Sequence, residues 1–217
     1  TRRTKVRKRM NLPRKWLLCL LLLAGCSSAA AAAPAWRIDP AHTRVLFRVD
    51  HAGFSTALGL LPAIEGELRF DPDDWAGARV EVVVPLPRLL MGDDGWREAL
   101  LSRPWFDAGR HPQARFRSTR VEATGEGSAR VHGLLTVRGE EKPVLLEVRL
   151  NKLARNPVGF RRTVGFSASA VLDRRDFGMD SWPNVVGTRV ELEIQAEAVR
   201  YTPDPDEEQD DADPQHD

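Results

Sequence analysis

The sequence predicts an all-β protein, an eight-stranded antiparallel up-and-down barrel with a short helical insertion. Apolar and polar residues alternate through most of the middle of the 217-residue chain. This pattern is typical of antiparallel strands with one solvent-exposed face. The alternating runs number eight, and only one short stretch has helical character. Eight strands could also flatten into a sandwich, but closure into a barrel leaves no free sheet edge.

The strands follow one another with turn residues between them, and each has one apolar face. The helical insertion is expected at Asp93–Ser102, which begins with acidic residues and has Leu100 and Leu101 near its end. The strands are expected at residues 44–50, 64–70, 79–84, 115–120, 131–137, 144–150, 164–172 and 190–198.

The stretch RVHGLLTVRGEEKPV, residues 130–144, shows the pattern of a hairpin. Val131, Leu135 and Val137 alternate onto one face, and the charged segment Gly139–Pro143 interrupts the alternation as a turn. The apolar face is expected to point into the barrel, with Gly133 leaving room there.

The inward positions favour a cavity over a filled core. None of them is charged, and several are small, so neighbouring strands would leave a dry space that suits one apolar guest. The small inward residues are Gly66, Gly133, Ala168, Ala170, Ala196 and Ala198.

The N-terminal segment has the composition of an export signal. Residues 1–15 hold eight basic residues and no acidic one, and an apolar run of ten residues, 16–25, follows. That run is too short to span a bilayer but suits a secretory signal. It ends in Leu23-Ala24-Gly25-Cys26, which resembles a bacterial lipobox, so residues 1–26 are expected to be a signal peptide with Cys26 as the lipidation site. Cleavage within the Ala-rich segment is the alternative.

The rest of the chain divides by composition into a linker, residues 27–35, a barrel domain, residues 36–202, and an acidic tail, residues 203–217. The tail has eight acidic residues and no basic one, so it is expected to be disordered. Without both ends, 24 basic and 23 acidic residues remain, and the balance excludes a nucleic-acid footprint. Both cysteines lie in the signal, so no internal disulfide is expected.

Histidines and carboxylates make only weak catalytic or metal signals. His42 and His51 flank the first strand and could share a rim, but no third ligand is evident in the pattern. Asp173 and Asp176 flank Arg174 and Arg175 and are interpreted as paired rim charges rather than a glycosidase pair. The sequence has no nucleophile elbow and no phosphate loop. The tryptophans of the barrel domain, expected at turns or strand ends, are Trp36, Trp75, Trp96, Trp105 and Trp182.

Four separated blocks resemble the YceI-like family, in order, from about residue 36 to residue 200. The first is IDPAHT (38–43) with the strand after it and His51; the second is SRPWFDAGRHPQARFRST (102–119). The third is GLLTVRGEEKPV (133–144), and the fourth is RRDFGM (174–179). The sequence departs from the family pattern after His51 and at Leu58–Leu61.

The resemblance implies an exported bacterial protein with a lipocalin-like barrel that holds a polyisoprenoid, such as a quinone tail, without catalysis or a cofactor. It places the chain in the periplasm, anchored to the outer membrane if Cys26 is lipidated and soluble otherwise. His42, His51 and Asp176 are expected near the mouth of the pore. The residues expected to line the pore are Phe47, Leu68, Val82, Phe116, Leu135, Leu146, Phe166 and Ile194.

Two other functions remain open at this level. A filled barrel could serve as an envelope stress or assembly partner, with the acidic tail as a docking segment. A metal-dependent enzyme could use His42 and His51. The expected partners are an isoprenoid lipid and the membrane, and a homodimer of two barrels stays open as well.

Overall fold

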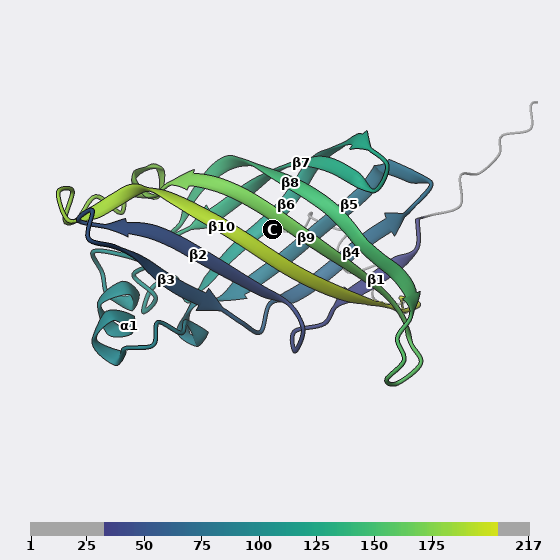
Figure 1. Ribbon diagram of the computed structural model, residues 1–217, viewed down its shortest axis with the longest axis horizontal. Coiled ribbons are helices and arrows are strands. Elements are labelled where there is room, and N and C mark those ends of the chain that lie inside the picture. Colours follow the sequence, from purple (N-terminus) through teal and green to yellow (C-terminus); the bar gives the residue numbers. More distant parts are fainter. Residues whose placement is uncertain (1–32, 204–217) are drawn as a thin grey trace, which may run out of the picture. The chain divides into compact units, whose positions relative to one another are not determined.

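The structure, a computed structural model, describes residues 33–203 and contains ten β-strands in that range (Figure 1). The signal peptide with Cys26, most of the linker and the tail from residue 204 lie outside the described residues. The strands are β1 (Ala35–Ile38), β2 (Arg44–His51), β3 (Ser55–Leu61), β4 (Glu65–Asp71), β5 (Asp74–Pro85), β6 (Gln113–Gly125), β7 (Ser128–Val137), β8 (Glu140–Arg155), β9 (Arg162–Asp173) and β10 (Val186–Arg200).

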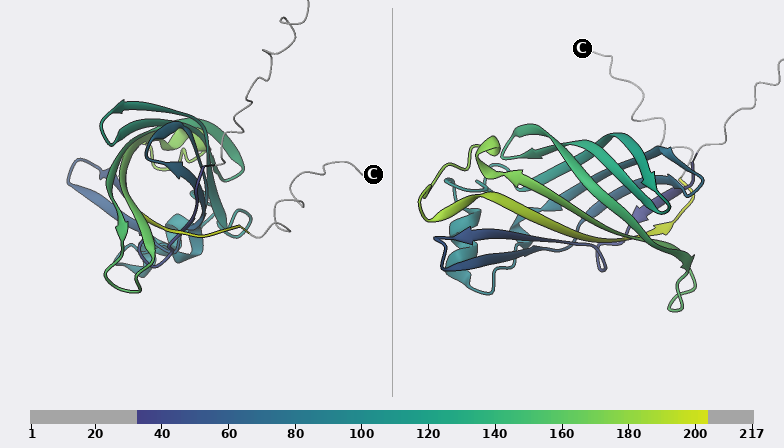
Figure 2. Two further views of the ribbon diagram at one scale, coloured as in Figure 1. Left: turned by 90° about the vertical axis from the view of Figure 1, so that its right-hand side faces the viewer. Right: turned by 45° about the horizontal axis from the view of Figure 1, so that its top comes forward.

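Eight of these strands form a closed antiparallel ring. Strands β4 to β10 pair with their chain neighbours in order, and β1 joins the two edges because it pairs with both β4 and β10. The left panel of Figure 2 shows the barrel end-on, so that the strands surround its interior. The predicted all-β, eight-stranded up-and-down barrel is therefore confirmed.

The structure contains two strands that the alternation did not predict. Strand β1 is four residues long, too short to show a period, and β3 (STALGLL) has no strict alternation. Strands β1 and β2 pair with the same edge of β10, at Ala198–Arg200 and Val186–Gln195 respectively. The predicted first strand, β2, thus extends the wall beside β1 and forms a hairpin with β3.

The helical elements gather at one end of the barrel. The helix α1 (Asp94–Leu101) is capped at its N-terminus by Asp93, whose carboxylate accepts a hydrogen bond from the N–H of Trp96 at 2.9 Å. The predicted insertion is therefore confirmed to within a residue at each side. Two 3-10 turns, η1 (Leu86–Arg88) and η2 (Arg174–Phe177), lie near it. We call this the helix end, and the opposite end, which β1 and the turn between β4 and β5 form, the terminal end.

The hairpin of β7 and β8 turns earlier than the sequence suggested. Its two turn residues are Arg138 and Gly139, with φ values of 55° and 83°. Two positive φ angles are the mark of a type I′ turn, whose twist matches that of the flanking strands. Residues 140–143, expected in the turn, already belong to β8.

Large buried side chains concentrate at the two ends of the barrel. Leu86 and Leu89 are fully buried at the helix end, whereas Trp36, Phe70 and Val164 are fully buried at the terminal end. Many inward residues between them are only partly buried. Within residues 33–203, no helix has both the length and the apolar character needed to cross a bilayer.

Candidate ligand-binding cavity

The barrel encloses a cavity of about 300 Å³ with an apolar surface. Its size falls at the lower end of the range typical of small-molecule sites. Alternate residues of the strands reach it, because side chains of one strand point to opposite faces in turn. The eight residues predicted to line the pore all line this cavity: Phe47, Leu68, Val82, Phe116, Leu135, Leu146, Phe166 and Ile194. Their contact with a ligand stays a prediction.

Three aromatic rings line the cavity toward the terminal end. Phe70 lies edge-on to both Trp75 and Phe166, with ring centroids 5.0 Å and 5.2 Å apart. The indole N–H of Trp36 donates a hydrogen bond of 2.9 Å to the carbonyl of Phe70, which fixes the strand that carries this ring. Aromatic pairs in this geometry contribute about 0.5–1.5 kcal/mol beyond their buried area.

Side chains from loops and short helices cover the cavity at the helix end. Leu86, Leu100, Trp105, Phe106, Phe177 and Met179 all line it there. Backbone hydrogen bonds fold the segment after α1 back over its last turn, from the N–H groups of Phe106 and Ala108 to the carbonyls of Leu100 and Leu101. The cover therefore rests on local contacts rather than on a strand ladder.

Arg174 holds two loops of the helix end together. It is only 3% exposed, and it donates hydrogen bonds to the carbonyls of Met179, Val186 and Gly187, the last at 2.9 Å. Its guanidinium also lies 5.1 Å from the ring centre of Trp105. Burial lowers the pKa of Arg174. Since its donors face the backbone, this cation serves the cover and leaves the cavity surface apolar.

Small inward residues do not leave space in the way the sequence suggested. A Cβ at Gly133 would lie 2.4 Å from the Phe116 ring, and one at Gly59 would lie 2.1 Å from the Phe47 ring. The Phe116 and Phe47 rings occupy the space that a side chain would take at these glycines. The expectation that Gly133 adds free volume is therefore wrong. Of the six small residues named, only Ala168 and Ala196 line the cavity.

None of the three polar residues expected at the mouth lines the cavity. His51 ends β2 at the helix end, where its ring lies 5.1 Å from that of Trp96, and Asp176 is exposed in η2. His42 precedes the other end of β2. The two histidines are nine positions apart in mostly extended chain, or roughly 30 Å, so they do not share a rim or a metal ion.

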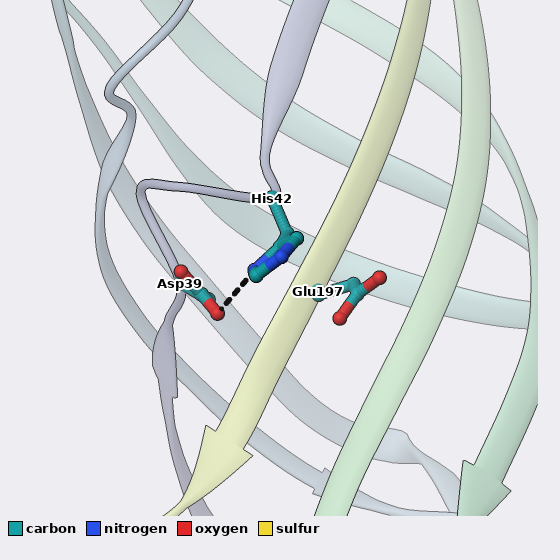
Figure 3. Close-up of side chains that lie close together, drawn as sticks. All are labelled: Asp39, His42 and Glu197. Atoms are coloured by element: carbon teal, nitrogen blue, oxygen red, sulfur yellow. Dashed lines mark hydrogen bonds and ion pairs between the residues drawn. The ribbon is translucent and has the colours of Figure 1, made fainter. Parts of the chain in front are cut away.

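His42 instead meets two carboxylates on the outside of the barrel, those of Asp39 and Glu197 (Figure 3). Its Nδ1 is 2.7 Å from Asp39 Oδ2. This hydrogen bond raises the pKa of His42. Partial burial raises the pKa of Asp39, but the hydrogen bonds of its carboxylate with His42 and Ala41 outweigh burial, and the pKa lies below its usual value.

Sequence reasoning missed this group, which is the one set of three potential metal ligands found among residues 33–203. Glu197 alternates with apolar residues in the last predicted strand and carries no metal signal of its own. The usable signal was Asp39 and His42 at i, i+3 in a turn, but the third ligand depends on the pairing of β1 with β10.

Two further polar residues, Asp173 and Ser167, have structural partners. Arg175 hydrogen-bonds the Asp173 carboxylate and lowers its pKa to about 2. Ser167 faces outward and hydrogen-bonds Asn151 and Gln195. Neither carboxylates nor hydroxyls project from these positions into the cavity.

The helix end also exposes large aromatic side chains. Phe54, in the turn between β2 and β3, is 92% exposed, Trp182 65% and Trp96 43%. A hydrogen bond of 2.6 Å from the N–H of Ala52 to the carbonyl of Val185 ties the first two loops together. Trp105 belongs to the cover at the same end, while Trp36 and Trp75 lie at the terminal end.

Comparisons with known proteins agree with this architecture. The sequence profile of the YceI-like domain matches residues 36–198. A UPF0312 protein of Photorhabdus laumondii is 32% identical over 179 residues, covering 82% of this chain and 92% of the relative.

Two solved structures share the fold at low sequence identity. The chain superposes on Burkholderia cenocepacia BcnA with a TM-score of 0.67 at 20% identity, covering 74% of this chain and 98% of the other. It superposes on a polyisoprenoid binding domain from Saccharophagus degradans, implicated in plant cell wall breakdown, with a TM-score of 0.60 at 11% identity. That match covers 77% of this chain and 99% of the domain.

Proposed function

This chain belongs to the YceI-like family, and from that premise we propose that it binds one polyisoprenoid or quinone-type lipid inside its barrel without catalysing a reaction. The observation that carries the proposal is the apolar cavity of about 300 Å³, lined from around the ring. Each methylene buried there contributes about 0.8 kcal/mol. A long apolar tail is the ligand that would bury the most methylene groups against such a surface.

The burial of the lining residues supports an unfilled interior. Val82, Leu146 and Phe166 point into the barrel yet remain partly accessible. In a filled core, side chains at such positions pack to the density of an organic crystal and expose little surface. A dry apolar space of this kind favours an apolar guest over water.

The choice of an isoprenoid among apolar lipids rests on the family. The related fold from Saccharophagus degradans is a polyisoprenoid binding domain, and we extend that ligand class to this chain. The lipid tail would lie along the barrel between the aromatic rings of the terminal end and the cover of the helix end. The proposed role is storage or transport of the lipid.

We further propose that the protein works in the bacterial cell envelope as a periplasmic lipoprotein anchored through Cys26. The basic segment, the short apolar run and the lipobox-like Leu23-Ala24-Gly25-Cys26 support this location. Metabolic labelling with palmitate in a Gram-negative host tests it. Labelling should occur in the wild type and disappear in Cys26→Ser, and an unlabelled wild type would overturn the anchoring.

The binding proposal is tested by organic extraction of the purified protein followed by mass spectrometry. A prenyl lipid should co-purify, and lipid-free protein should take up added quinone. Phe166→Arg places a charge in the cavity and should abolish loading while circular dichroism stays strand-like. Ser169→Arg, on the outer face of the same strand, is the matched control and should load normally. A wild type that neither carries nor takes up a prenyl lipid would refute the proposal.

A further inference from the structure

The corner between β1 and β2 holds a second site, on the outer face of the barrel and separate from the cavity. Three groups meet there: the carboxylates of Asp39 and Glu197 and the imidazole of His42. One ligand atom from each lies within 4.8 Å of the others. Figure 3 shows the His42 ring between the two carboxylates.

Backbone hydrogen bonds hold the three residues in place before any ligand binds. The N–H of Asp39 donates to the carbonyl of Glu197 at 2.8 Å, and the N–H of Glu197 donates to the Thr43 hydroxyl at 3.1 Å. The N–H of Ala41 donates to Asp39 Oδ1 at 2.9 Å. Ligands on a preorganised backbone lose little entropy when they bind a metal ion.

We propose that Asp39, His42 and Glu197 bind one divalent transition-metal ion of the Zn²⁺ class, with water in the remaining coordination positions. One imidazole nitrogen and two carboxylate oxygens are a ligand set that Zn²⁺ accepts, at bond lengths of about 2.0–2.2 Å. Such bonds place the ligand atoms about 3.4 Å apart in a tetrahedral site. The observed separations, 2.7 Å between His42 Nδ1 and Asp39 Oδ2 and at most 4.8 Å within the set, lie on either side of that spacing.

A second histidine on the outer surface, His132, has an arginine hydrogen-bonded to its ring and can be compared with His42. His132 also lies beside a carboxylate, Glu122, at 3.3 Å, but Arg120 bonds to both and supplies the positive charge there. At the corner, no lysine or arginine of the described residues forms an ion pair with Glu197. A metal ion would supply the charge that Arg120 provides at the other site.

Other charges around the corner limit how tightly the ion binds. Arg44 donates to the carbonyl of Ala41 at 2.9 Å, and Lys152 and Arg155 line the polar depression that His42 and Glu197 border. These cations oppose a divalent ion, whereas the two carboxylates attract it. We therefore expect a Kd on the order of micromolar rather than nanomolar.

The test is calorimetric titration of the full chain with Zn²⁺ at pH 7.5, in the wild type and in His42→Ala, Glu197→Gln and His132→Ala. One Zn²⁺ per chain should bind the wild type and His132→Ala equally, and the two corner variants should bind it at least tenfold more weakly. Equal affinity in the wild type and His42→Ala, or no stoichiometric binding to the wild type, overturns the proposal. Glu197→Gln keeps the side-chain shape, so it separates ligand loss from unfolding.

Two further readouts exclude the cysteines and the carboxylates of the acidic tail as the source of binding. Co²⁺ at the corner should give ligand-field bands without the near-ultraviolet absorption of a cobalt–thiolate bond. Because the metal displaces the proton of His42, affinity should fall about tenfold per pH unit below the pKa of that imidazole. A thiolate band, or affinity independent of pH, would place the ion elsewhere.

Discussion

The two ends of the barrel are closed in different ways. At the terminal end, β1 pairs with β4 on one side and β10 on the other, so backbone ladders run around the ring. At the helix end, α1, η1, η2 and their loops cover the cavity with side chains and local hydrogen bonds. Opening the terminal end would break several ladder bonds at once. The helix end could open by moving loops, so we expect the lipid to pass there.

The largest effect is expected from Arg174→Met at the helix end. The change leaves the carbonyls of Met179, Val186 and Gly187 without their donor in a buried setting. We expect a loss of about 3–5 kcal/mol in the free energy of unfolding, measured with urea, because removal of a buried charged partner is costly. Arg175→Met, on the exposed neighbour, is the control. Equal losses in the two variants would mean that Arg174 does not hold the cover.

A smaller effect is expected from Trp36→Phe at the terminal end. The variant keeps an aromatic ring but loses the indole N–H that bonds the carbonyl of Phe70. The buried carbonyl then lacks its donor, which should cost about 1–3 kcal/mol in urea unfolding. Rates of quinone uptake and release should stay near the wild-type values. A large increase in those rates would show that the terminal end is the gate.

Hydrogen exchange compares the two ends directly. The amides of Phe106 and Ala108 lie in the cover, and those of Trp36 and Arg37 lie in β1 between two paired strands. We expect exchange at least about tenfold faster in the cover, because loops open locally at lower free energy than core strands. Bound lipid should slow exchange in the cover more than in β1. Faster exchange in β1 would reverse the comparison.

The smallest effect is a pH dependence at the corner of β1 and β2. The hydrogen bond to Asp39 raises the pKa of His42, so the stabilisation from this pair is fully present below about pH 6.5, the unfolded value. It is lost as the pH rises through the higher folded pKa. Unfolding midpoints of wild type and His42→Ala in metal-free buffer should therefore converge as the pH rises above about 6.5. A gap that widens with pH would contradict the raised pKa.

The lining of the cavity could be predicted because it depends on local geometry. Successive side chains of a strand alternate between its two faces, so the inward positions of Phe166 and Ile194 follow from their place in an alternating run. The helix at residues 94–101 could be predicted equally well, because the residue that caps it, Asp93, is adjacent in the chain.

The errors arose where residues distant in the sequence meet. Gly133 seemed to leave space until the register of β6 and β7 placed the Phe116 ring over it. His42 and His51 seemed to share a rim because they flank one strand, but the ends of a strand lie at opposite ends of the barrel wall. The four residues of β1 gave no periodic signal, although β1 closes the ring.

The sequence alone determined the all-β class, seven of the eight strands in the ring and the inward apolar faces, because the period of two is a property of the extended backbone. Only the tertiary structure decided which strands close the ring, which rings occupy the space above the glycines and which carboxylate joins Asp39 and His42. These depend on register between strands, and register is set by packing and hydrogen bonds summed over the whole barrel.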